Sequence, residues 1–149
     1  MGINVVWDDP EETTIRCDIR SSWTWDELQQ AREQVYALMD KTGHRRVFAI
    51  ANFVDGNARI PKEAMSQFKS LVLNSHDHPR AGLTVVVGAT EFLQAFFKGL
   101  QQTARMLGRR VEFRYADSLE EARRLIGKEH LKHNQRAAEG QVHHQPING

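Results

Sequence analysis

The pattern of apolar and polar residues near the N-terminus predicts a β-hairpin. The mainly apolar run Ile3 to Asp8 is followed by a polar turn that contains Pro10. From Thr13 to Ile19 apolar and polar residues alternate, and the apolar ones are Ile15, Cys17 and Ile19. A period of two residues is typical of a strand with one buried face. We therefore expect two strands joined by a tight turn.

Three further segments have the composition of strands. Residues 47–54 and 83–88 are apolar at nearly every position, which is typical of strands buried on both faces, as in parallel sheets. Residues 111–115 alternate and predict a last strand. The two apolar runs need cover on both faces of the sheet. For the second face, a further copy of the chain and the last helix are the two candidates.

Four segments repeat apolar residues at the three- and four-residue spacing of an amphipathic helix. These predicted helices cover residues 24–42, 61–72, 90–107 and 117–132. Thr24 and Glu27 fit a capping box, and Trp25 is expected to anchor the first helix to the core. The element order β-β-α-β-α-β-α-β-α predicts an α/β fold with a mainly parallel sheet of about five strands and right-handed crossovers.

The composition changes after residue 127. Residues 128–149 contain three branched aliphatic residues, no aromatic residue and four of the seven histidines. We expect residues 1–127 to form one α/β domain. Residues 128–149 are expected to form a polar extension, whose last dozen residues are a mobile tail.

The overall composition excludes several classes of protein. The chain has 149 residues, 40% of them hydrophobic, with 20 basic side chains, 19 acidic side chains and one cysteine. A single cysteine excludes an internal disulfide scaffold, and the balanced charge gives no reason to expect a nucleic-acid partner. No apolar run approaches the 18 or so residues of a transmembrane helix, and the N-terminus lacks the features of a signal peptide. We therefore expect a cytoplasmic protein.

Three stretches give the chain a family resemblance. They are Trp23-Thr-Trp-Asp-Glu27, Gly82-Leu-Thr-Val-Val-Val-Gly88, and Gly108-Arg-Arg-Val together with Tyr115-Ala-Asp-Ser-Leu-Glu-Glu-Ala-Arg123. With the order of elements, residues 3–127 resemble a STAS or SpoIIAA-like domain. The resemblance implies a small α/β fold that serves protein–protein regulation or binds apolar molecules.

The chain departs from that family at its phosphorylation site. STAS antagonists of anti-sigma factors resemble one another in an Asp-Ser stretch after the third strand, whose Ser is phosphorylated. Asp55 matches the family Asp, but no Ser or Thr directly follows it, and the nearest hydroxyl is Ser66. We expect no phosphorylation switch at this place.

Polar residues at the end of the 47–54 strand are the first candidate site. Asn52, Asp55, Asn57 and Arg59 lie where open α/β sheets often bind ligands. One interpretation is a turn and helix entry, with Asn52 hydrogen-bonded to a neighbouring loop. The other is a ligand site, or the site of an enzyme built on Asn52, Asp55 and Arg59.

Aromatic residues provide the second candidate site. Phe92 and Phe96 widen the apolar face of the 90–107 helix. They are either core, or part of a face that binds a protein partner or a second copy of the chain. Alternatively, Phe92 and Phe96 line an apolar pocket together with Phe53 and Phe68.

No motif of an enzyme, metal site or cofactor site is present. The histidine pairs at 76 and 78 and at 130 and 133 lack a third strong ligand nearby, so we expect neither a metal nor a cofactor. The leading hypothesis is a non-enzymatic regulatory or interaction module. The alternative is a binding protein for a lipid or other apolar small molecule, and an enzyme is the weakest hypothesis.

Overall fold

The computed structural model describes residues 2–21, 23–43, 46–55, 67, 81–108 and 112–144, the last twelve of these by their backbone alone. The helix predicted over residues 61–72 lies outside these ranges except for Gln67, and Asn57, Arg59 and Phe68 also lie outside them. No helix within the described ranges combines the length and the hydropathy that are needed to cross a membrane.

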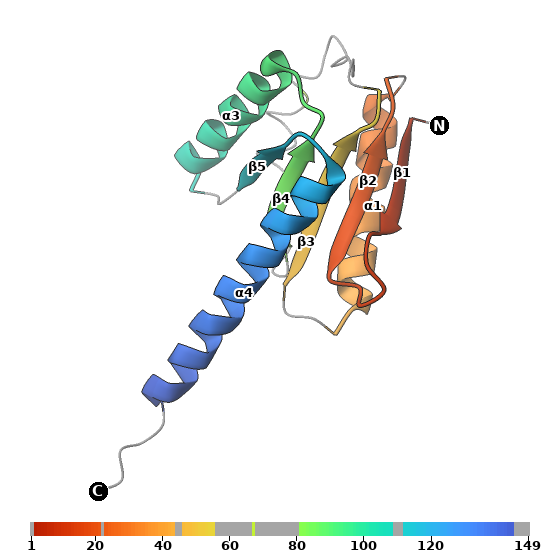
Figure 1. Cartoon of the computed structure of the whole chain (residues 1–149). Helices are drawn as coiled ribbons and strands as arrows, with labels where there is room; N and C mark the ends of the chain where they lie inside the picture. The colour runs from red at the N-terminus through yellow and green to blue at the C-terminus, as the bar shows by residue number, and fades with distance from the viewer. Residues whose placement is uncertain are drawn as a thin grey trace, which may run out of the picture.

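Five strands of the described chain form one sheet in sequential order (Figure 1). They are β1 (Ile3–Trp7), β2 (Thr14–Ile19), β3 (Val47–Phe53), β4 (Ala81–Val87) and β5 (Phe113–Ala116). The first pair is antiparallel, and every later pair is parallel. The predicted α/β class with a mainly parallel sheet is therefore confirmed.

The helices of the described chain cover both faces of this sheet. They are α1 (Trp25–Lys41), α3 (Glu91–Met106) and α4 (Leu119–His144). Side chains alternate between the faces along a strand: Val86 packs with Leu93 of α3, whereas its neighbour Val85 packs with Ile126 of α4. Because Leu28 of α1 joins the Val86 cluster, α1 and α3 lie on one face and α4 lies on the other.

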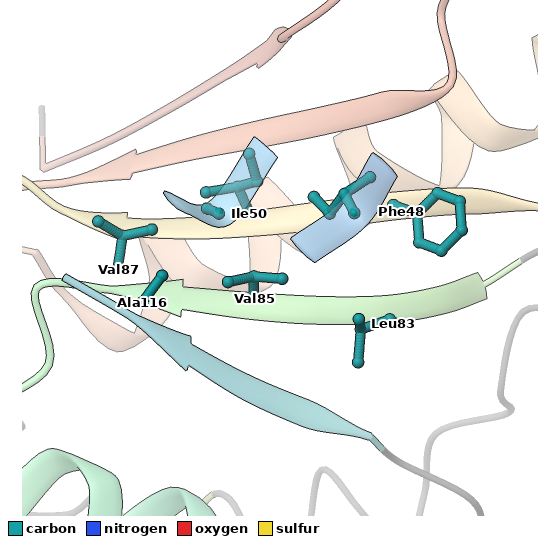
Figure 2. Close-up of a cluster of buried hydrophobic side chains, with 8 residues drawn as sticks. Phe48, Ile50, Leu83, Val85, Val87 and Ala116 are labelled. Carbon is teal, nitrogen blue, oxygen red and sulfur yellow. The ribbon is translucent and has the colours of Figure 1, made fainter. Parts of the chain in front are cut away.

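Helix α4 supplies the cover that the apolar strands require. Ala122 and Ile126 of this helix pack onto β3, β4 and β5. Figure 2 shows the strand residues of this cluster, which are Phe48, Ile50, Leu83, Val85, Val87 and Ala116. Ile50, Val85 and Val86 are all fully buried. The continuous apolar sequence of β3 and β4 thus reflects burial on both faces of the sheet. Helix α4 of the same chain, and not a second copy, covers the second face of these two strands.

Helix α4 is longer than the sequence pattern predicts. It continues to His144 rather than ending near Lys132, and its second half extends beyond the sheet (Figure 1). The predicted boundary at residue 127 therefore falls inside a helix. Residues 135–139 read Gln-Arg-Ala-Ala-Glu, which are strong helix formers, so local propensity favours a helix even without an apolar stripe.

The start of α1 has the predicted capping box. Thr24 is the N-cap, and its hydroxyl accepts a hydrogen bond from the Glu27 N–H at 3.2 Å. The Glu27 carboxylate also accepts from the Gly2 N–H, which ties the N-terminus to the helix. Trp25, which is expected to anchor the helix, is partly buried, and Trp23 is the more deeply buried tryptophan at 8% exposed. Trp23 precedes the N-cap, so its side chain enters the core from the loop and not from the helix.

Candidate functional site

A cavity of about 110 Å³ lies on the face of the sheet that carries α1 and α3. Its lining side chains are apolar and come from three strands, two helices and one loop. They are Ile3, Ile19, Trp23, Leu28, Ala51, Phe53, Leu93, Phe96 and Phe97. The site therefore brings together residues that are far apart in the sequence, from β1 to α3.

The sheet forms the floor of this cavity. Ile3 pairs with Ile19, and Ile19 pairs with Phe53, so these three side chains form one row across β1, β2 and β3. Ala51 lies two residues before Phe53 and therefore points to the same face. Its single methyl group leaves more room than any other strand residue of the lining.

Helix α3 forms an aromatic wall. Leu93, Phe96 and Phe97 are spaced three and four residues apart, so they share one face of the helix. The Phe97 ring lies 5.9 Å from Phe96, 6.1 Å from Phe53 and 5.1 Å from Phe113, measured between ring centroids. Tilted and edge-to-face aromatic pairs of this kind hold each other in place. The wall is therefore held in one arrangement before any ligand arrives.

Trp23 lines the cavity through its apolar ring atoms, and its indole nitrogen contributes no surface to the cavity. Its indole Nε1 is buried and, within the described ranges, has no hydrogen-bond partner. The backbone around Trp23 is closely held: its N–H donates to the Arg20 carbonyl at 3.2 Å, and the Arg20 N–H donates to the Gly2 carbonyl at 2.7 Å. A Cβ on Gly2 would lie 2.4 Å from the Trp23 Cα. Only glycine allows this approach, so the N-terminus keeps the tryptophan in position.

The chemistry available in the cavity is that of binding. The lining carries no carboxylate, thiol, imidazole or amine. Cys17 lies in β2, two residues before Ile19 of the lining. Burial raises the pKa of its thiol to about 12. It therefore stays protonated and serves as a packed apolar side chain.

The polar residues predicted as a strand-end site bond to separate partners. Asn52 lies on the opposite face of the sheet from the cavity, and its Nδ2 donates to Asp18 Oδ1 of the neighbouring strand at 2.9 Å. Asp55 is exposed and accepts from the Ser21 N–H at 2.8 Å, a hydrogen bond that lowers the pKa of its carboxyl. Both side chains therefore join segments of the fold, and the structure does not bring them together in one site.

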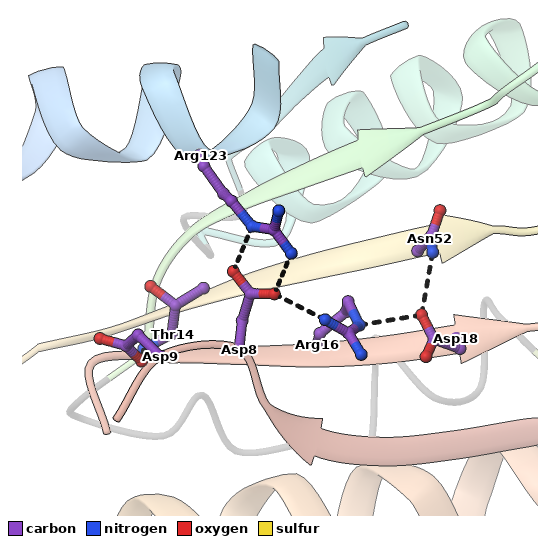
Figure 3. Close-up of polar contacts among 7 residues, drawn as sticks. All are labelled: Asp8, Asp9, Thr14, Arg16, Asp18, Asn52 and Arg123. Atoms are coloured by element: carbon purple, nitrogen blue, oxygen red, sulfur yellow. Dashed lines mark hydrogen bonds and ion pairs between the residues drawn. The ribbon is translucent and has the colours of Figure 1, made fainter. Parts of the chain in front are cut away.

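Asn52 belongs to a polar network on the α4 face (Figure 3). Arg16 donates to Asp18 at 3.1 Å and to Asp8 at 2.7 Å. Arg123 of α4 also donates to Asp8, whose side chain is only 4% exposed. Hydrogen bonds from Arg123 and Arg16 outweigh the effect of burial and lower the pKa of Asp8. Each guanidinium in this network faces a carboxylate of opposite charge, so the network stabilises the fold.

The two phenylalanines predicted to act together have different surroundings. Phe96 is 9% exposed and lines the cavity, whereas Phe92 is 72% exposed on the first turn of α3. The interpretation of Phe96 and Phe53 as pocket residues agrees with the lining. Phe92 does not contribute to it.

Sequence reasoning missed much of the lining. The sequence predicts Ile3, Ile19 and Ala51 as strand residues and not as parts of a site. Their period-two spacing indicates a shared face, but it carries no sign of a void. A cavity depends on how far α1 and α3 stand from the sheet, which no local pattern encodes.

Neither the described side chains nor a comparison with known proteins indicates a metal site or a family. In the part of the chain that the structure describes, no group of three or more His, Cys, Asp or Glu side chains is arranged to hold a metal ion. Comparison with known proteins finds no matching family model, no matching curated protein and no matching solved structure.

Proposed function

We propose that this chain is a non-enzymatic binding protein that takes up a small apolar molecule in the cavity beneath α1 and α3. The cavity itself is the observation that supports the proposal. Its lining is apolar throughout, and burial of apolar surface favours an apolar occupant over water. Dry cavities of about 150 Å³ bind benzene or xenon, so a cavity of about 110 Å³ suits a compact molecule of similar kind.

The arrangement of the polar groups supports a non-enzymatic role. Asp8, Asp18, Asn52 and Asp55 all form hydrogen bonds that join segments of the fold. The resemblance to STAS or SpoIIAA-like domains, which serve as regulatory or binding modules, agrees with this proposal.

Saturable binding of a small hydrocarbon tests this function. In an NMR titration with methylenecyclopentane, resonances of Ile19, Ala51 and Phe97 should shift together and reach a plateau. Ala51→Val adds two methyl groups to the floor and should weaken binding at least tenfold, because it occupies the space of the ligand. Phe92→Leu alters an exposed aromatic outside the lining and should leave binding unchanged. Loss of binding in Phe92→Leu alone would indicate adsorption to the surface and would contradict the proposal.

A second candidate function rests on the exposure of Phe92. Phe92 is 72% exposed on the first turn of α3, which leaves a large apolar side chain that a partner would cover. We propose a second copy of this chain as the occupant. Sedimentation at rising protein concentration should then give a dimer that Phe92→Asp converts to monomer. A wild-type chain that stays monomeric up to millimolar concentration would contradict self-association.

A further inference from the structure

Two large apolar side chains of α3 point away from the sheet at opposite ends of the helix. Phe92 in the first turn is 72% exposed, and Met106 in the last turn is 86% exposed. Met106 comes fourteen residues after Phe92, which is close to four helical turns, so the two side chains lie on the same side of the helix. That side is opposite the one through which Leu93 and Ala104 are buried.

Small residues lie between these two side chains. Gly99 is exposed and lies seven residues from each of them, and a Cβ there would meet nothing within 4 Å. Ala95, one turn earlier, is also exposed. Glycine allows close approach of another backbone but weakens a helix relative to alanine. We call Phe92, Ala95, Gly99 and Met106 the outer face of α3.

A column of charged residues flanks the outer face. Glu91, Lys98 and Arg105 are exposed and seven residues apart, so they lie one above the other along the helix. The column is acidic at its start and basic at its end. In its middle, the Lys98 ammonium lies 6.0 Å from the centroid of the Tyr115 ring on β5. Because the charge changes sign from one end to the other, the column is complementary to its own reverse.

We propose that the outer face of α3 binds the outer face of a second copy of this chain, with the two helices antiparallel and crossing at Gly99. Phe92 of each copy then packs on Met106 of the other, and contacts between a thioether and an aromatic ring are favourable. Glu91 of each copy pairs with Arg105 of the other, whereas a parallel pair would bring like charges together. A two-fold dimer requires such a self-complementary surface. This inference rests on the second candidate function, which places a second copy at Phe92, and it is independent of the cavity.

A cysteine at the crossing point tests the geometry. Gly99→Cys has room for its side chain in the single chain, and mild oxidation should link the two copies of the dimer through a disulfide. Gly127→Cys is the matched control, because Gly127 is an exposed glycine of α4 where a Cβ also meets nothing within 4 Å. It should give no more linked dimer than the wild-type chain, whose single cysteine packs within the core.

An exchange of charges tests the pairing of Glu91 with Arg105. Glu91→Arg and Arg105→Glu should each weaken the dimer about tenfold in sedimentation, because each brings like charges together at two symmetric places. The double variant should regain the wild-type dissociation constant within about threefold. Within one helix these two residues are roughly 20 Å apart, so such a rescue requires contact between copies. Both side chains are exposed, and the variants should keep the fold.

Met106→Asp tests the far end of the face and should also weaken the dimer at least tenfold. Leu131→Asp is its control, because Leu131 is a large apolar residue that is 63% exposed on α4, and it should leave the dimer unchanged.

The possible results separate the inference from the function on which it rests. Suppose that the wild-type chain dimerises and Phe92→Asp abolishes the dimer. If Gly99→Cys then links no more than Gly127→Cys, or if the double charge variant gives no rescue, the copies meet in another geometry. The inference is then overturned, while self-association stands. If the wild-type chain stays monomeric up to millimolar concentration, self-association and the inference both fail.

Discussion

Arg123 of α4 and Asp8 at the end of β1 are joined by two hydrogen bonds, of 2.9 Å from Nε to Oδ2 and 2.8 Å from Nη2 to Oδ1 (Figure 3). The two residues are 115 positions apart in the sequence. The contact joins α4 to β1, which is an edge strand of the sheet. The apolar cluster beneath α4 involves only β3, β4 and β5. Arg16 shares the same carboxylate at 2.7 Å.

Removing the charge of Asp8 should destabilise the fold. Asp8→Asn replaces a carboxylate that accepts from two guanidinium groups with a neutral amide, and hydrogen bonds to charged groups are worth roughly 1.5–3 kcal/mol. We expect the free energy of unfolding, measured in urea, to fall by about 2 kcal/mol. Arg123→Gln should cost about 1 kcal/mol, because half of that side chain is exposed.

Arg124 offers the matched control for Arg123. It is the next residue on α4, it is exposed, and Arg124→Gln removes the same charge. Its effect should stay within about 0.5 kcal/mol. Equal losses in the two arginine variants would show that helix charge, and not the contact with Asp8, sets the stability.

The Asp8 carboxylate should make the free energy of unfolding depend on pH. The pKa of Asp8 lies below its ordinary value of 3.8 in the folded chain, chiefly because of its hydrogen bond to Arg123. A lowered folded pKa stabilises the protein above the unfolded pKa, and this contribution is lost as pH falls through the folded pKa. The difference in unfolding free energy between wild type and Asp8→Asn should therefore be largest at neutral pH and should shrink steadily below about pH 4. A difference that does not change between pH 7 and pH 2 would contradict the role assigned to the ionised carboxylate.

Two glycines should respond to alanine in opposite directions. Gly88 follows β4 with φ +75°, and a Cβ there would lie 2.7 Å from the Phe53 carbonyl oxygen. Gly88→Ala should thus cost roughly 1–3 kcal/mol from backbone strain alone. Gly99 lies within α3, and a Cβ there would meet nothing within 4 Å. Gly99→Ala should stabilise the protein by up to about 1 kcal/mol through helix propensity. Thermal unfolding of both variants tests the pair.

Truncation of Phe96 should lower the free energy of unfolding far more than truncation of Phe92, because only Phe96 is buried. Phe96→Ala removes a buried ring from the cavity wall, and such changes cost about 3–5 kcal/mol. Phe92→Ala removes an exposed ring and should change the unfolding free energy by less than about 0.5 kcal/mol. Similar losses in both variants would place Phe92 in the core and would remove the basis for a docking surface at that residue.

The strands and most helix ends could be predicted from the sequence because local chemistry determines them. Strict alternation gave β2, apolar runs gave β3 and β4, and the hydroxyl of Thr24 gave the start of α1. The length of α4 was underestimated, because its second half has helix propensity without an apolar stripe.

The candidate site was largely beyond prediction. Asn52 was singled out as a polar residue in an apolar strand, yet its partner Asp18 comes from a strand 34 residues earlier. Phe92 and Phe96 are both apolar and four residues apart, so nothing local distinguishes the exposed ring from the buried one. Trp23 precedes a capping box, and its backbone lies against Gly2, a contact that no local pattern predicts.

The most direct test of apolar binding is a crystal structure determined under xenon pressure. Xenon occupies apolar cavities of this size without needing a hydrogen bond, and the lining of this cavity is apolar. A bound xenon atom in contact with Ile19, Ala51 and Phe97 is the predicted result, and it should be absent from crystals of Ala51→Val. A well-ordered structure with no xenon there, and with the space filled by side chains of the chain itself, would contradict the proposed function.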